Sequence, residues 1–172
     1  MNKKEIVWIF GKSASGKETF IKKVVADQKL AKKFNWICEG ITYSSHSLNF
    51  TGNDEDKRVI SARKNIIKDV LTLQKDFNVI LIKWQYIDTL LDTPQKLLLL
   101  LPGSNHKIIL LEVPSAKLEA RLKNKKWWQE SSDSNEFDKH ETKMVLESVS
   151  KLKSDFEIIK IDSGSDKYKT IT

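Results

Sequence analysis

The residues of this chain that are best suited to chemistry form a glycine-bounded loop near its start. Gly11 and Gly16 are separated by four residues and Lys17 follows at once, so the loop fits the pattern G-x-x-x-x-G-K. In such a loop, backbone N–H groups converge on a phosphate, and the lysine reaches the outer phosphates of a nucleotide. We therefore expect the whole loop to contact a nucleotide: Gly11, Lys12, Ser13, Ala14, Ser15, Gly16, Lys17, Glu18 and Thr19.

The loop departs from the usual pattern at Glu18. The residue after the lysine is ordinarily Ser or Thr, and its hydroxyl binds Mg²⁺. Thr19 stands one position later, and we expect it to serve as the metal ligand instead. The alternative is that Thr19 is only a residue of the first helical turn and that the metal is poorly held. For this reason the loop indicates nucleotide binding more firmly than catalysis.

The segments on either side of the loop predict a strand and a helix. Residues 6–10 form a continuous apolar run, as expected of a strand buried on both faces of a parallel sheet. Apolar residues then recur at helical spacing over residues 18–33. A phosphate-binding loop requires this order of strand, glycine loop and helix.

Apolar runs and amphipathic segments continue to alternate along the chain. Further strands are expected within residues 37–43, 79–82, 107–113 and 156–161. Further helices are expected within residues 55–77, 93–101, 115–125 and 136–153. The alternation predicts an α/β fold, a five-stranded parallel sheet with helices on both faces. The 172 residues show no internal repeat, so we expect a single domain over residues 1–172.

Composition excludes several classes of protein. A formal net charge of +7 would attract nucleotides, but the basic residues are spread along the chain, so we do not favour a specific nucleic-acid surface. One cysteine and three histidines exclude a disulfide framework and a His/Cys zinc site. No segment reaches the length of a membrane span, and the first residues run directly into a strand. We expect a cytoplasmic protein with no membrane contact and infer no obligate protein partner.

The order of these elements, with the phosphate loop first, resembles the small P-loop kinases. This group includes gluconate, shikimate, guanylate and polynucleotide 5′-hydroxyl kinases. The resemblance covers nearly the whole chain in layout, and its specific sequence match is the loop at residues 11–19. It implies the P-loop NTPase fold, with ATP and Mg²⁺ as cofactors and Lys17 as a catalytic residue.

Two further segments carry weaker matches to these kinases. Residues 108–122 resemble the strand, proline and helix with Arg-Leu that precede their mobile lid. This implies that Arg121 is catalytic and faces the transferred phosphate, and that a lid lies near residues 121–140. The second match comes after the last predicted strand, where a loop packs beside the adenine ring in related kinases: Asp162, Ser163 and Gly164. A surface turn is an equally good interpretation of that segment.

Acidic residues that are common in these kinases are replaced at two places. A carboxylate often helps to hold Mg²⁺ at the end of the third strand, but Lys83 stands there in this chain. Another often accepts the proton of the substrate hydroxyl after the second strand. Here the candidates for substrate binding are His46 and Asp54, with Arg58 suited to an anionic substrate.

The resemblance implies an ATP-dependent phosphotransferase that moves the γ-phosphate of ATP to a small-molecule or nucleotide acceptor. Two alternatives remain open. The chain could bind or slowly hydrolyse ATP without transfer, which Glu18 and Lys83 favour. It could also be a kinase for nucleic-acid 5′-hydroxyl groups, which the positive charge and the adjacent Trp127 and Trp128 favour.

Overall fold

A single mixed sheet forms the centre of the molecule. The computed structural model describes residues 3–36, 40–45, 55–84, 93–129, 134–165 and 167–171. In these ranges six strands form one sheet in the order β2-β3-β1-β4-β5-β6. The strands are β1 (Glu5–Phe10), β2 (Ile41–Ser45), β3 (Val79–Lys83), β4 (Asn105–Glu112), β5 (Glu157–Asp162) and β6 (Lys169–Ile171). The first five are parallel to their neighbours, and β6 is antiparallel to β5.

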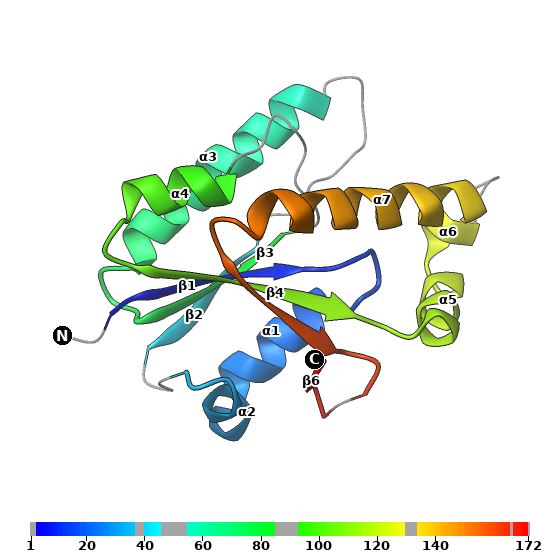
Figure 1. The fold of residues 1–172 in the computed structure, drawn as a ribbon, viewed down its shortest axis with the longest axis horizontal. Helices are drawn as coiled ribbons and strands as arrows, with labels where there is room; N and C mark the ends of the chain where they lie inside the picture. Colours follow the sequence, from blue (N-terminus) through cyan, green and yellow to red (C-terminus); the bar gives the residue numbers. More distant parts are fainter. Residues whose placement is uncertain are drawn as a thin grey trace.

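Helices cover both faces of the sheet (Figure 1). They are α1 (Lys17–Ala26), α2 (Gln28–Lys33), α3 (Glu55–Leu73), α4 (Thr93–Leu100), α5 (Ser115–Lys123), α6 (Lys126–Gln129) and α7 (Ser134–Leu152). Helices α1 and α2 lie on one face, and α3, α4 and α7 lie on the other, while α5 and α6 stand beyond the carboxyl end of β4 (Figure 1). In the described ranges no helix has both the length and the apolar character needed to cross a bilayer.

Strand β1 is apolar throughout because both of its faces are covered. Trp8 and Phe10 belong to the core beneath α3, α4 and α7. Val7 and Ile9 belong to the core beneath α1 and α2. Side chains alternate between the faces of a strand, so a strand buried on both faces loses the usual polar alternation. The result is a rigid central strand whose carboxyl end fixes where the glycine loop begins.

The sheet has six strands rather than the five that the sequence predicts. The additional strand, β6, has only three residues, all exposed, which is too short for an alternation of apolar and polar residues to be recognised. Just before it, Tyr168 is buried against Phe20 of α1, with ring centroids 5.0 Å apart. Tyr168 thus joins the residues just before β6 to α1, the helix that follows the glycine loop.

One predicted helix is divided in the structure. The predicted helix over residues 18–33 is two helices, because Asp27 adopts an extended conformation and its carboxylate accepts a hydrogen bond of 2.8 Å from the Lys29 N–H. Aspartate favours such caps over helix interiors because its side chain competes for backbone donors. The structure has β2 from Ile41, after Gly40 with φ 87°, and residues 37–39 of the predicted second strand lie outside the described residues.

Candidate phosphate-binding site

The glycine loop lies between β1 and α1, at the carboxyl end of the central strand. Gly11 has φ 146°, and a Cβ atom there would lie 2.6 Å from Ser15 Oγ and 2.7 Å from the Leu111 carbonyl oxygen. Only glycine fits at that position. Gly16 has φ 89° and precedes the first residue of α1. The two glycines therefore shape a turn whose backbone runs directly into a helix N-terminus, where anions bind favourably.

Lys17 is folded back over the loop. Its ammonium donates hydrogen bonds to the carbonyl oxygens of Gly11 at 2.7 Å and Lys12 at 2.8 Å, and its residue is only 6% exposed. Burial lowers the pKa of Lys17 to about 8, the charge of Glu141 opposes the fall, and the charge of Lys83 adds to it. A buried ammonium beside other cations gains from an anionic ligand, because the ligand supplies the charge that burial removes.

Arg121 of α5 reaches the same loop. Its guanidinium donates to the carbonyl oxygen of Ala14 at 3.3 Å and to that of Ser163 at 2.9 Å. The sequence places Arg121 in the chain's lid-like segment, and the structure brings it to the loop, 3.6 Å from the Cβ position of Gly16. Its part in phosphate transfer stays a prediction.

The segment after β5 also contacts the loop. The Ser163 hydroxyl donates to the Ser15 carbonyl oxygen at 2.7 Å. The Asp162 carboxylate accepts the Gly164 N–H at 2.7 Å, which closes a tight turn. The segment that the sequence predicts beside the adenine ring is thus in contact with the loop that it predicts to hold the phosphates.

Glu18, the residue that breaks the sequence pattern, forms a charged group with two lysines. Its carboxylate lies 2.7 Å from the Lys22 ammonium and 3.4 Å from that of Lys83. The hydrogen bond from Lys22, and then the charge of Lys83, lowers the pKa of Glu18. The two departures from the kinase pattern are therefore paired with each other: Glu18 stands on α1 where Ser or Thr is usual, and Lys83 stands at the end of β3 where an acid is common.

The side chains around Glu18 offer few free ligand atoms to a metal ion. Glu18 offers carboxylate oxygens of the kind that Mg²⁺ prefers, but two ammonium groups already lie against it. Thr19 is exposed on α1. Within the described ranges no group of three or more His, Cys, Asp or Glu residues could hold a metal ion. These residues fit a cation that is held chiefly by phosphate and water, with Glu18 or Thr19 as a minor contributor.

Two carboxylates from α7 complete the surroundings of the loop. The Glu141 carboxylate accepts the Ser13 N–H at 2.9 and 3.1 Å and the Ser13 hydroxyl at 2.5 Å. Asp138, one helical turn earlier, lies 2.8 Å from the Lys12 ammonium. Glu141 is only 3% exposed. The sequence does not predict this contact, which joins residues 128 positions apart.

Comparisons with known proteins bear on the fold. No protein-family model matches the chain, and no curated protein matches its sequence. A chain of the PezAT toxin–antitoxin system of Streptococcus pneumoniae has a TM-score of 0.60 and 16% identity, covering 100% of this chain and 72% of that one. Shikimate kinase from Bacteroides thetaiotaomicron has a TM-score of 0.57 and 16% identity, with coverages of 94% and 88%. A sugar kinase from a Janibacter species has a TM-score of 0.56 and 13% identity, with coverages of 95% and 87%.

The chain has a P-loop kinase-like fold. We call its glycine loop, residues 11–19, the P-loop. This confirms the resemblance inferred from the sequence, apart from the additional antiparallel strand β6. At these identities the likeness concerns the fold, and the acceptor has to be inferred from the site itself.

The predicted acceptor residues lie outside the described part of the site. His46 and Asp54 fall outside the described residues. Arg58 belongs to α3, but its side chain is not among those described. In the segment near residues 121–140, Trp128 of α6 packs edge-on against Phe137 of α7, with ring centroids 5.9 Å apart. The P-loop side of the site is therefore defined in detail, and the acceptor side rests on prediction.

The sequence did contain one signal for Glu141. Along α7 the buried positions are Glu141, Val145, Ser148 and Leu152. These positions recur every three or four residues, so Glu141 stands in the stripe that faces the core. A carboxylate in such a stripe needs a partner, because unpaired buried charge is costly. The P-loop supplies that partner.

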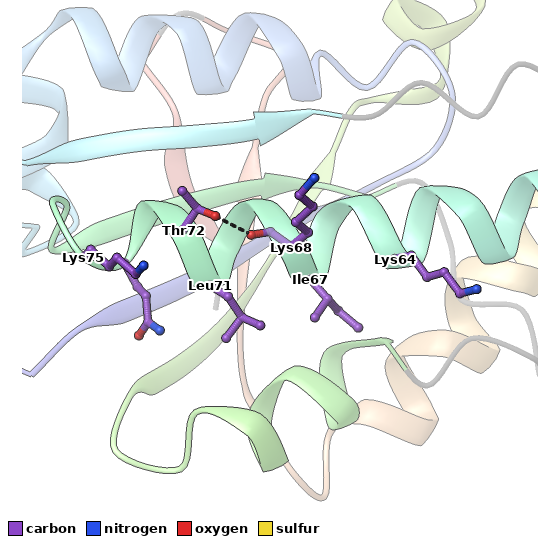
Figure 2. Close-up of a pocket in the computed structure, with 7 residues that line it drawn as sticks. Lys64, Ile67, Lys68, Leu71, Thr72 and Lys75 are labelled. Carbon is purple, nitrogen blue, oxygen red and sulfur yellow. Dashed lines mark hydrogen bonds between the residues drawn. The ribbon is translucent and has the colours of Figure 1, made fainter.

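A separate cavity of about 540 Å³ opens along α3. Ile67 and Leu71 point from α3 toward α4, with Lys64 and Lys75 at the two ends of the labelled group (Figure 2). No residue of the P-loop lines this cavity. It plays no part in the site described above.

Proposed function

We propose that this chain binds ATP on the P-loop and transfers its γ-phosphate to a small molecule or nucleotide. The observation that carries the proposal is the position of Lys17. Its buried ammonium has a pKa of about 8 and lies within a glycine-shaped loop at a helix N-terminus. Such a group binds phosphate well, because the anion restores the charge balance that burial disturbs.

The residues around the P-loop have distinct roles in this proposal. Backbone N–H groups of the loop and the Lys17 ammonium would hold the β- and γ-phosphates, and Arg121 would neutralise charge as the γ-phosphate moves. In transfer to a hydroxyl, the acceptor would give its proton to a base, for which His46 and Asp54 are the predicted candidates. Its oxygen would form a bond to the γ-phosphorus, the bond to the bridging oxygen would break, and ADP would leave with the electron pair. Positioning and charge stabilisation would supply most of the rate.

The remaining predicted residues define the rest of the site. Asp162, Ser163 and Gly164 would lie beside the adenine, because Ser163 is hydrogen bonded to the loop through Ser15. A bound Mg²⁺ would neutralise phosphate charge, with Thr19 or Glu18 as the protein's contribution. His46, Asp54 and Arg58 remain the predicted acceptor residues, and the acceptor could be sugar-like, since the structural neighbours include a sugar kinase and a shikimate kinase.

The proposal is tested by calorimetric titration with ATP and by a phosphotransfer assay over a panel of hydroxyl and phosphate acceptors. Lys17→Ala should weaken ATP binding by at least about tenfold, which corresponds to about 1.4 kcal/mol. Lys29→Ala removes the same charge from an exposed position on α2 and should leave binding unchanged. Unaltered ATP binding and transfer in Lys17→Ala would refute the proposal.

A second candidate is a module that binds ATP without transferring phosphate. The paired Glu18 and Lys83 favour it, because the end of β3 carries a cation where kinases of this kind often carry an acid. Tight ATP binding without product from any acceptor would support the module. Phosphorylation of any acceptor, lost in Arg121→Ala but retained in Lys123→Ala, would support the kinase.

A further inference from the structure

The P-loop already holds an anion that belongs to the chain itself. Both oxygens of the Glu141 carboxylate lie within 3.1 Å of the Ser13 backbone nitrogen, and one accepts the Ser13 hydroxyl at 2.5 Å. These are the kinds of donor with which such loops bind phosphate oxygens. Glu141 is only 3% exposed, and the Ser13 donors satisfy its carboxylate oxygens.

The neighbouring cation is also engaged by α7. The Lys12 ammonium lies 2.8 Å from Asp138, and the charge of Glu141 opposes the fall in the pKa of Lys17. The two α7 carboxylates thus act on one N–H group, one hydroxyl and two ammonium groups of the loop. By contrast, Gly16 gives the N-terminus of α1 no side-chain cap. In the proposed function the helix N-terminus would be an inner phosphate position and Ser13 an outer one, and Glu141 already occupies the donors of Ser13.

The direction of a bound phosphate chain follows from the surrounding elements. The predicted adenine segment contacts the loop at Ser15 and continues to Tyr168, which packs on the α1 side of the sheet. Helix α7 covers the opposite face (Figure 1). In the proposed function the nucleotide would begin at this segment and cross the loop toward α7. Its last phosphate would then approach Ser13, where the Glu141 carboxylate lies.

We propose that Glu141 determines which phosphate chain the loop accepts, because its carboxylate competes with the terminal phosphate of a nucleoside triphosphate for the Ser13 donors. This inference rests on the proposed function and adds to it a selectivity against the third phosphate. ATP displaces the Glu141 carboxylate to bind fully, whereas ADP binds at the inner position and leaves the Glu141 contact in place. Asp138 adds to the selectivity by engaging Lys12.

Displacement of Glu141 has a second consequence within α7. Phe137 lies one turn before Glu141 and packs against Trp128 of α6. A movement of this part of α7 therefore changes the surroundings of Trp128. Tryptophan fluorescence should respond to ATP more than to ADP, and the difference should be lost in Trp128→Phe.

The test compares the affinities for ATP, ADP and AMP in Glu141→Gln and in the wild-type chain by calorimetry. Glutamine keeps an oxygen that accepts the Ser13 N–H but removes the charge that repels phosphate. We expect ATP to bind about tenfold more tightly and ADP to change by less than about threefold, since charged hydrogen bonds are roughly twice as strong as neutral ones. AMP should be unaffected.

Two further variants separate selectivity from folding. Asp138→Asn changes a carboxylate that is 44% exposed, so it should keep the fold, and it should raise ATP affinity by about threefold. Glu147→Gln removes the same charge from an exposed position further along α7 and should change nothing.

The outcomes distinguish this inference from the proposed function. If both ATP and ADP bind, and neither Glu141→Gln nor Asp138→Asn gains ATP affinity over ADP, Glu141 only braces the loop and the selectivity is refuted. If neither nucleotide binds to the wild-type chain or to any variant, the proposed function itself is wrong. A gain for ATP alone in both variants supports the inference.

Discussion

The Lys83 ammonium at the end of β3 lies 3.4 Å from the Glu18 carboxylate at the start of α1. Each residue alone would look like a defect in a P-loop kinase-like chain. Together they form an ion pair between α1, which follows the P-loop, and β3, the strand beside β1. The pair keeps a cation close to the phosphate site, where it also acts on Lys17.

The Glu18–Lys83 pair should affect the electrostatics of the phosphate site more than the free energy of unfolding. Glu18 is 54% exposed and keeps Lys22 as a partner when Lys83 is removed. We expect Lys83→Met to change the free energy of unfolding by less than about 1 kcal/mol, as is usual for exposed ion pairs. Urea denaturation measures this value. A loss several times larger would show that the pair holds α1 to the sheet.

The affinity for ATP should depend on the protonation of Lys17. Its pKa of about 8 means that the free chain loses this ammonium as the pH rises through 8, and a phosphate ligand stabilises the protonated form. ATP affinity should therefore be highest near pH 7 and fall between about pH 8 and 9, by up to about tenfold per pH unit. Calorimetric titration at several pH values tests this.

The Lys83→Met variant provides a matched check on that pH profile. Lys83 lowers the pKa of Lys17, so its removal should move the fall in ATP affinity to higher pH. A profile identical to that of the wild-type chain would mean that Lys83 does not act on Lys17.

Gly11 should tolerate no side chain. In Gly11→Ala the new Cβ atom would approach the Leu111 carbonyl oxygen to 2.7 Å at a φ of 146°. We expect a loss of about 2 to 3 kcal/mol in the free energy of unfolding, from backbone strain and overpacking together. Gly103→Ala is the control, because a Cβ atom there has nothing within 4 Å. Equal stability of the two variants would contradict the observed loop conformation.

His106 on β4 should make the fold less stable in mild acid. Burial lowers its pKa below the usual value of 6.5, while the backbone of Leu101 opposes the shift. As the pH falls through about 6.5 the unfolded chain takes up a proton that the folded chain resists, so stability falls with pH in this range. Urea denaturation between about pH 7.5 and pH 5 should show the loss in the wild-type chain.

Two variants separate His106 from the other titrating groups. His106→Leu should have a flatter pH dependence below about pH 6.5. His140→Gln, which changes an exposed histidine on α7, is the control for loss of an imidazole. An unchanged slope in His106→Leu would assign the acid sensitivity to another group.

The parts of the fold that the sequence predicts are those determined by local patterns. The run from Ile6 to Phe10 is apolar because both faces are covered, and Gly11 and Gly16 have conformations that other residues rarely adopt. The break between α1 and α2 at Asp27 and the strand β6 are harder to predict. A single aspartate cap and three exposed residues show no hydrophobic periodicity.

The sequence predicts the loop side of the site but not the side that α7 contributes. Lys17 and the loop follow from a motif, and Arg121 follows from a resemblance. Glu141 and Asp138 come from a helix whose many charges look like a solvated surface, and their contact with the loop depends on how α7 packs against the sheet. Only the buried stripe of α7 could have singled out Glu141.

The contact between Tyr168 and Phe20 affects the order in which parts of the fold form during synthesis. The helix that follows the P-loop is made early in synthesis, yet one of its core partners lies almost 150 residues later in the chain. Until those residues leave the ribosome, the apolar face of α1 remains partly uncovered. The P-loop therefore reaches its final surroundings only when the last part of the sheet has formed, and a nascent chain that stops at β5 should not bind nucleotide at full strength.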